Sequence, residues 1–188
     1  MLLALTIGLP AQASSRGVIV DSRVETYPVQ GDTIREIQRS IALNTPSRNG
    51  DSFYAGETIW SLSAKYAVVP TDAGCRFQNG KVHLTLRVRL PVLTSTPNSE
   101  AVRAEWERFH RALTAHEVLH QQNAYRAATD LKSKLSGTQT ALSCVRAKQV
   151  AERAIQSLIE RISQYDKELD RQTRHGATQG AALNLDVR

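Results

Sequence analysis

Val82-His83-Leu84-Thr85-Leu86-Arg87-Val88-Arg89-Leu90 alternates apolar and polar residues along its whole length. Successive side chains of a β-strand point to opposite faces of a sheet, so this pattern predicts a strand with one face in the core and one in solvent. Asn79-Gly80, just upstream, is a strong signal for a hairpin turn that joins this strand to a short one at residues 75–77. Further strands are predicted over residues 58–69 and 17–30.

The other segments carry helical signals. A short helix is predicted over residues 33–43, and two long helices are predicted over about 100–135 and 143–171, where apolar residues recur at intervals of three and four. Residues 172–188 read as a loop or a loose tail. We therefore predict an α+β domain in which a small antiparallel sheet packs on two long C-terminal helices.

His116-Glu117-Val118-Leu119-His120 lies in the middle of the first long helix. Residues four apart share one helical face, so both imidazoles can reach a single metal ion, and Glu117 can hold a water molecule and accept its proton. These are the groups needed for zinc-assisted hydrolysis of an amide bond. Both histidines fall where the pattern calls for an apolar residue, and an unpartnered buried imidazole is costly. The competing interpretation is a pair of core histidines bonded to backbone or carboxylate groups.

A catalytic zinc site needs a third protein ligand, and the residues leave three candidates open. An antiparallel pairing of the long helices would bring Glu160 level with the motif, although its helical angle turns it toward solvent. Glu152 lies nearer the apolar stripe but about two turns away along the axis. His175 follows the second helix, and the chain would have to bend back to reach the motif, which Gly176 and Gly180 permit.

The composition describes one globular domain. The chain has 188 residues, of which 41% are hydrophobic and 22% charged. Its formal net charge is +6, but basic residues alternate with acidic ones along the two long helices and do not cluster. We therefore expect no nucleic-acid partner, while an unspecific attraction to an anionic cell envelope stays open. We also expect no transmembrane segment.

The beginning of the chain resembles an export signal. An apolar run over residues 2–9 precedes Ala11-Gln12-Ala13, a small-x-small cleavage pattern, so residues 1–13 are predicted to be a signal peptide. No basic residue precedes Arg16, which leaves a buried N-terminal strand as the alternative.

The cysteines agree with export. Cys75 and Cys144 are the only two, and an even pair in an oxidising compartment indicates one disulfide. This bond would tie the strand region to the start of the last helix. We therefore predict a secreted or periplasmic protein.

Short motifs are distributed over residues 24–181. They are Tyr27-Pro28-Val29-Gln30-Gly31, Thr33, Asn44, Pro46, Gly50, Tyr54, Gly56, Thr58, Trp60, Tyr66, Trp106, the HExxH segment, and Asp170-Arg171-Gln172-Thr173-Arg174-His175-Gly176-Ala177-Thr178-Gln179-Gly180. Together they resemble the bacterial family of predicted secreted zinc-dependent proteases, a family of unknown function named from its HExxH motif. The HExxH segment and the closing D-x-x-T-x-H-G-x-x-Q-G signature are the specific ones. Leu169 departs from the family pattern, which usually has Tyr before that Asp.

The resemblance implies a single zincin-like metallopeptidase domain over residues 17–181, followed by a tail over 182–188. It implies the same pairing of the two cysteines. It also favours His175 over Glu160 as the third zinc ligand.

The resulting hypothesis is a secreted or periplasmic zinc metallopeptidase that acts on peptide or protein substrates. In it, His116, His120 and His175 bind zinc, with Glu160 as the alternative third ligand, and Glu117 is the general base.

Two further residues are candidates for supporting roles. Asp170 is a candidate to orient a ligand histidine, or to cap the end of the helix. Tyr165, on the expected buried stripe of the last helix, is a candidate oxyanion donor or an ordinary core residue. The alternative function is a non-catalytic exported protein that binds metal or the cell envelope, which would not need Glu117.

Overall fold

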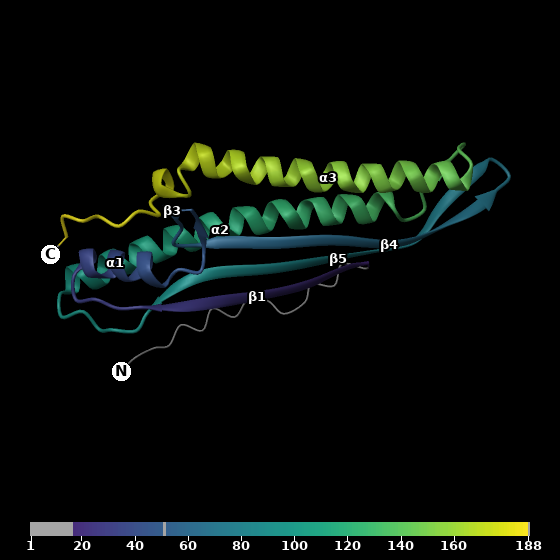
Figure 1. Cartoon of the computed structure of the whole chain (residues 1–188). Helices are drawn as coiled ribbons and strands as arrows, with labels where there is room; N and C mark the ends of the chain where they lie inside the picture. The colour runs from purple at the N-terminus through teal and green to yellow at the C-terminus, as the bar shows by residue number, and fades with distance from the viewer. Residues whose placement is uncertain (1–16, 51, 188) are drawn as a thin grey trace.

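Long strands and long helices lie side by side along one axis, which gives the molecule an elongated shape (Figure 1). The computed structural model of the protein describes residues 17–50 and 52–187, so the predicted signal peptide over residues 1–13 lies outside the described part. In chain order the elements are β1 (Val18–Val29), α1 (Ile34–Asn44), β2 (Arg48–Asn49), β3 (Ser52–Phe53), β4 (Glu57–Thr71), β5 (Gly74–Leu93), α2 (Glu100–Lys134), β6 (Gln139–Thr140), α3 (Cys144–Thr173) and η1 (Ala177–Gln179). The α+β class is as predicted.

The sheet is mixed and not purely antiparallel as predicted. β5 is the central strand, with β4 antiparallel on one side and β1 parallel on the other, and β6 adds a short antiparallel pairing at one end of β5. A parallel pair needs a long crossover connection, and the chain between β1 and β5 supplies one through α1 and β4. The alternation in β5 fixes which face is buried but not the direction of its neighbours.

The predicted turn at Asn79-Gly80 is a β-bulge instead. The β4–β5 hairpin turns at residues 72–73, and pairing continues past the bulge, from Lys65↔Lys81 to Ala67↔Gln78. Two residues of β5 therefore lie opposite one residue of β4, and Asn79 takes the left-handed conformation with φ 55°. The same preference for positive φ that makes Asn-Gly a turn signal also serves a bulge.

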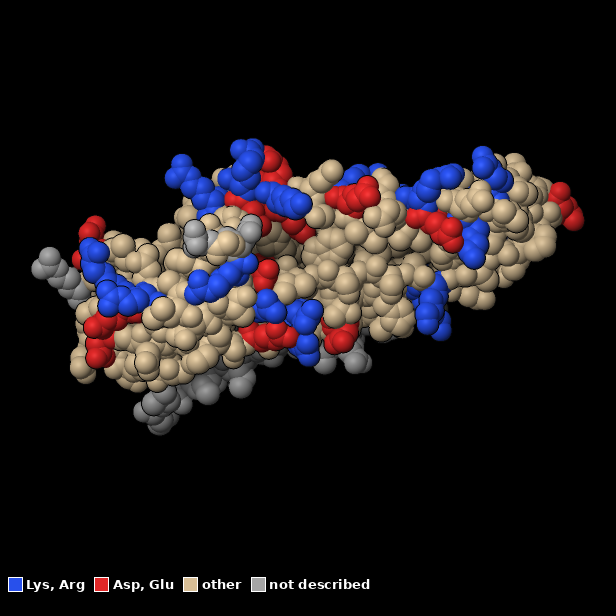
Figure 2. Space-filling model, viewed as in Figure 1, with Lys and Arg blue, Asp and Glu red and all other residues tan. Residues whose placement is uncertain are grey.

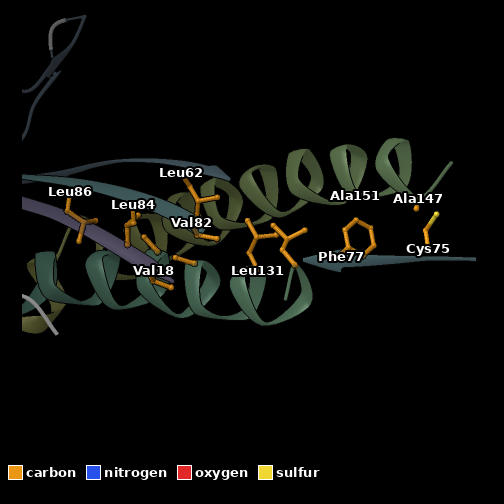
Figure 3. Packing of buried hydrophobic residues seen from close by; sticks show 13 residues of the cluster. Val18, Leu62, Cys75, Phe77, Val82, Leu84, Leu86, Leu131, Ala147 and Ala151 are labelled. Carbon is orange, nitrogen blue, oxygen red and sulfur yellow. The ribbon is translucent and has the colours of Figure 1, made fainter. Parts of the chain in front are cut away.

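Two hydrophobic clusters divide the core along the length of α2. One cluster, drawn in Figure 3, packs the inner face of β4 and β5 against the C-terminal half of α2 and the start of α3. The other packs α1 and the far ends of β1 and β5 against the N-terminal half of α2. α1 itself begins with a capping box between Thr33 and Glu36, the arrangement that satisfies the free amides of a helix start. The HExxH segment lies on α2 between the two clusters.

The segment that follows η1 packs against the second cluster through alternate apolar side chains from Ala181 to Val187. Arg108 of α2 donates hydrogen bonds to the carbonyls of Gly180 and Ala182, at 2.7 and 2.6 Å. The predicted tail is therefore attached to α2.

α3 starts farther along the molecule than α2 ends (Figure 1). The connection between them contains β6, which pairs with β5 beside Cys75. Cys75 and Cys144 form the predicted disulfide, with 5.3 Å between their Cα atoms, and so fix the first residue of α3 near the tip of the β4–β5 hairpin.

Charged side chains of both signs alternate on the face shown in Figure 2, as on an ordinary solvated surface. Within residues 17–50 and 52–187, no helix combines the length and the apolar character needed to cross a membrane.

Removing the disulfide should lower the free energy of unfolding by about 4 kcal/mol, the chain-entropy value for a loop of this size. Urea unfolding of a Cys75→Ala/Cys144→Ala double variant tests this. The wild type in reductant should fall to the value of the variant, and the variant should not respond to reductant. Equal stability of oxidised wild type and variant would contradict the prediction.

Candidate metal centre

The middle of α2 buries three polar side chains within the HExxH segment. His116, Glu117 and His120 are 2%, 3% and 6% exposed. The predicted helical stripe therefore does turn both histidines inward, and Glu117 faces inward with them. Burial of three such groups requires partners, because an unpaired buried polar group costs several kcal/mol.

Asp170 of α3 completes a triangle of donor atoms with the two histidines. The Nε2 atoms of His116 and His120 are 3.3 Å apart, and they lie 3.0 and 3.1 Å from Oδ1 of Asp170. A tetrahedral zinc ion with bonds of about 2.0 Å separates its ligand atoms by about 3.3 Å. The three side chains can therefore hold a metal ion of this size, and they form the group of candidate ligands in the described part of the chain.

The outer nitrogen of each imidazole is held by a separate acceptor. Nδ1 of His116 lies 2.8 Å from Oε1 of Gln179, and Nδ1 of His120 lies 3.1 Å from Oδ1 of Asp166. A proton on each Nδ1 satisfies these contacts and leaves both Nε2 lone pairs directed at Asp170. Three electron-rich atoms then converge on one point, which calls for a cation, and outer partners of this kind are usual for metal-binding histidines.

The pKa shifts of the site residues also favour a positive charge between the histidines and Asp170. Burial lowers the pKa of His120, but the neighbouring Asp166 and Asp170 outweigh burial and raise it to about 10. Burial likewise opposes the charged form of His116, and its contacts with Asp170 and Gln179 reverse this and raise its pKa. The pKa of Asp170 is well below its usual range because its contacts with the histidines outweigh burial. Without a metal ion, the site therefore retains a proton.

Glu117 lies beside this triangle. Its Oε2 accepts a hydrogen bond of 2.8 Å from the hydroxyl of Thr58, and burial raises its pKa despite that bond. Gly56 passes close to its other oxygen, since a Cβ at that position would lie 2.8 Å from Oε1. The carboxylate is thus fixed on one oxygen, and the backbone beside the other is free of a side chain.

Asp166 joins three elements of the site. Besides His120, it accepts hydrogen bonds from the indole of Trp60 on β4, at 2.7 Å, and from the amide of Asn123 on α2, at 3.0 Å. Asp166 was not predicted as a site residue, and Thr58 and Gln179 were named only among the motifs of the family resemblance, without a role in the site. A usable signal was the spacing of Asp166 and Asp170, which repeats on α3 the four-residue spacing of the histidines on α2.

The helix register explains why Glu160 lies elsewhere. Glu160 would be level with the motif if α3 turned straight back beside the end of α2, but β6 and the disulfide place the start of α3 farther out along the sheet. Asp170, ten residues and about 15 Å beyond Glu160, comes level with the motif instead. Glu160 is exposed and accepts a hydrogen bond from Gln156.

His175 returns to the site but does not join the triangle. Three consecutive left-handed residues, Arg174, His175 and Gly176, reverse the chain after α3. Nδ1 of His175 lies 3.6 Å from Oδ1 of Asp170, and its ring lies against Tyr54 with centroids 4.3 Å apart. Gly176 packs directly on the ring of His116, because a Cβ there would lie 2.9 Å from Cγ.

Tyr165 does not lie on the buried face of α3 as expected. It is 55% exposed, whereas the next residue, Asp166, turns inward toward His120. The apolar stripe of α3 predicts a buried Tyr165 only if it continues to the end of the helix. In the structure the inward face of α3 becomes polar where it meets the site.

An open cleft of about 830 Å³ lies between β4, α2 and α3. Its lining includes the side chains of the site described above: His116, Glu117, His120, Asp166, Asp170 and His175. Gly56 and residues 57–62 of β4 line one side of it. Glu117 and all three corners of the triangle are thus among the residues that line this cleft.

In the metal-free protein, the free energy of unfolding should fall as pH rises from about 7 to about 10. The pKa of His120 rises from 6.5 to about 10 on folding, so the stability it adds is complete below pH 6.5 and is lost as pH rises through 10. Asp166→Asn should reduce this slope, and Asp130→Asn, at an exposed position of α2, should not. Urea unfolding across this pH range in chelator checks both, and an unchanged slope for Asp166→Asn would contradict the assignment.

A family comparison covers most of the chain. Residues 24–176 match the model of a family described as bacterial protein of unknown function (DUF922). No curated protein and no solved structure matches the chain. The matched residues run from β1 to the turn after α3 and include all three corners of the triangle. The chain therefore belongs to this family of bacterial proteins of unknown function.

Proposed function

We propose that this protein is a zinc-dependent peptidase that hydrolyses peptide bonds in polypeptides outside the cytoplasm. The observation that carries the proposal is a buried carboxylate, Glu117, beside three metal-binding atoms that converge in an open cleft. Each part has a separate use in hydrolysis.

The donor set suits zinc. Two imidazole nitrogens and one carboxylate oxygen form a common set of protein ligands for a catalytic zinc ion, which keeps a further position open. When bound, zinc supplies a Lewis acid that makes water nucleophilic near neutral pH and withdraws electron density from a carbonyl group. His116, His120 and Asp170 would hold it, and Gln179 and Asp166 would keep the two imidazoles in the required tautomer.

Glu117 is the proposed general base. It accepts a proton from the water that attacks the peptide carbonyl and then delivers this proton to the nitrogen of the leaving amine. Burial raises its pKa, so this carboxylate accepts the proton from water more readily than an exposed glutamate would. Thr58 holds Oε2, so that Oε1 is the oxygen available for proton transfer.

The position of β4 favours a polypeptide substrate. β4 is an edge strand that pairs only with β5 in the described part of the chain, and its residues 57–62 form one side of the cleft. The free edge of a strand can bind an extended peptide through backbone hydrogen bonds, which is a common mode of peptide recognition.

Glu117 also separates this proposal from a non-catalytic role. A protein that only binds a metal ion or the cell envelope has no need for a further carboxylate, 3% exposed, beside its ligands. Burial of such a group without catalytic use would cost stability for no gain.

The disulfide supports an exported location. Cys75–Cys144 would not persist in a reducing cytosol, so a secreted or periplasmic protein is the proposal that agrees with it.

Glu117→Gln should lower kcat on an unfolded protein substrate by about 10²-fold or more, with zinc content unchanged, because general-base catalysis contributes on that order. Hydrolysis of labelled casein by zinc-loaded protein provides the measurement. Glu160→Gln makes the same change at an exposed position of α3 and should retain full activity. A fully active Glu117→Gln variant would remove Glu117 from the mechanism.

Asp170→Ala should weaken zinc binding more than His175→Ala does. Loss of one of three ligands should exceed the 10- to 100-fold loss of affinity that is typical when a supporting residue is removed. Competition with a chromophoric chelator measures both affinities. The opposite order would make His175 the third ligand, as the sequence resemblance implied.

A further inference from the structure

A second hollow continues the cleft along the same two elements. It has a volume of about 640 Å³, and Ala64, Tyr66 and Val68 of β4 and Val145 and Ile155 of α3 are among its lining residues. The cleft at the metal centre is bordered by the preceding part of β4, residues 57–62, and by the following part of α3, from Ile159 to Asp170. The two hollows therefore follow one another along β4 and α3, and together they are called the groove here.

The far part of the groove differs in chemistry from the part at the metal centre. Its β4 side presents alternate residues, Ala64, Tyr66 and Val68, which point to the same face of the strand. Val145, in the first turn of α3, is 69% exposed although it is apolar. Lys65, Lys148 and Glu152 also line this hollow, but apolar and aromatic side chains are the majority. Apolar surface next to a free strand edge suits the alternate side chains of an extended polypeptide.

The length of the groove sets the size of its occupant. Thr58, which contacts Glu117, and Tyr66 are eight residues apart on one strand, which corresponds to about 26 Å. A segment of about eight extended residues is needed to reach from one to the other. The disulfide at Cys144 holds the start of α3 against the sheet, so the far part of the groove is fixed in place.

We propose that this far part of the groove is a distal binding site for the substrate polypeptide, which holds an apolar side chain about eight residues from the bond that is cleaved. The proposal rests on the proposed peptidase function and adds the substrate class to it: extended, unfolded protein segments and not short peptides. The protein is then an endopeptidase whose efficiency depends on substrate length.

Val145→Glu tests the distal site, because it places a charge in the apolar groove at an exposed position. Val150→Glu is the matched control, since Val150 is a 43% exposed valine of the same helix that does not line the groove. Once a cleavage position in casein has been mapped, two peptides are made, one of about six residues around that position and one of about sixteen that reaches the far groove. Loss of one apolar anchor should lower kcat/KM for the longer peptide about tenfold. The value for the short peptide and both values for Val150→Glu should stay unchanged.

A binding measurement keeps the distal site separate from catalysis. Fluorescence anisotropy of labelled unfolded casein with metal-free protein should show about tenfold weaker binding for Val145→Glu than for the wild type or Val150→Glu. If casein binds in this way but is never hydrolysed with zinc, the peptidase proposal fails, and the far part of the groove stands as a binding site for an extended polypeptide. If long and short peptides are cleaved equally well by all three proteins, the distal site is overturned and the peptidase proposal stands. Self-association of the wild type that Val145→Glu abolishes would also overturn it, by showing that the groove binds a second copy of the chain.

Discussion

Two pairs of side chains, one on each long helix, determine the relation between α2 and α3. His116 and His120 are four residues apart on α2, Asp170 and Asp166 are four apart on α3, and the contacts between them run antiparallel. All four groups are largely removed from water, so neither helix can slide by a turn without leaving a charge or an imidazole unpaired. Truncating one member of a buried pair of this kind usually destabilises a protein by about 3–5 kcal/mol. The rest of the fold therefore has to hold α2 and α3 in this register.

The sheet and the disulfide provide that register. Because β6 extends the connection and Cys144 is bonded to Cys75, α3 begins beside the hairpin tip and reaches the level of the histidines only in its last two turns. Trp60 of β4 donates a hydrogen bond to Asp166, so β4, α2 and α3 are all joined at this one carboxylate. Three carboxylates and two imidazoles lie close together there, so the site favours a cation or bound protons.

Periodicity predicted the parts of the fold that depend on local patterns. The alternation around Leu86, the long apolar stripe of α2 and the N-terminal half of the stripe of α3 correspond to buried faces in the structure. Strand direction and the role of Asn79-Gly80 were predicted wrongly, because pairing partners distant in the chain determine both.

The candidate site was predictable only in part, for a related reason. The HExxH segment can be recognised in the sequence, because its residues lie close together on one helix and share one face. Its partners lie on another helix, and their identity depends on a shift along α3 that a loop and a disulfide produce. Antiparallel pairing of the two long helices predicted Glu160 at the level of the HExxH segment. In the structure this place is taken by Asp170, ten residues farther along α3. Gln179 belonged to the recognised closing signature, but nothing in the sequence indicated that its amide would meet His116.

The turn that carries Gln179 has a consequence for when the site can exist. This turn is attached to α2 by Arg108, whose guanidinium also pairs with the buried Glu105 and donates to two carbonyls beyond η1. The residues that build the site extend from Thr58 to Gln179, so a chain that is still being synthesised cannot assemble it until Gln179 is free to fold. The triangle and its outer partners therefore form only at the end of folding, after almost the whole domain is available.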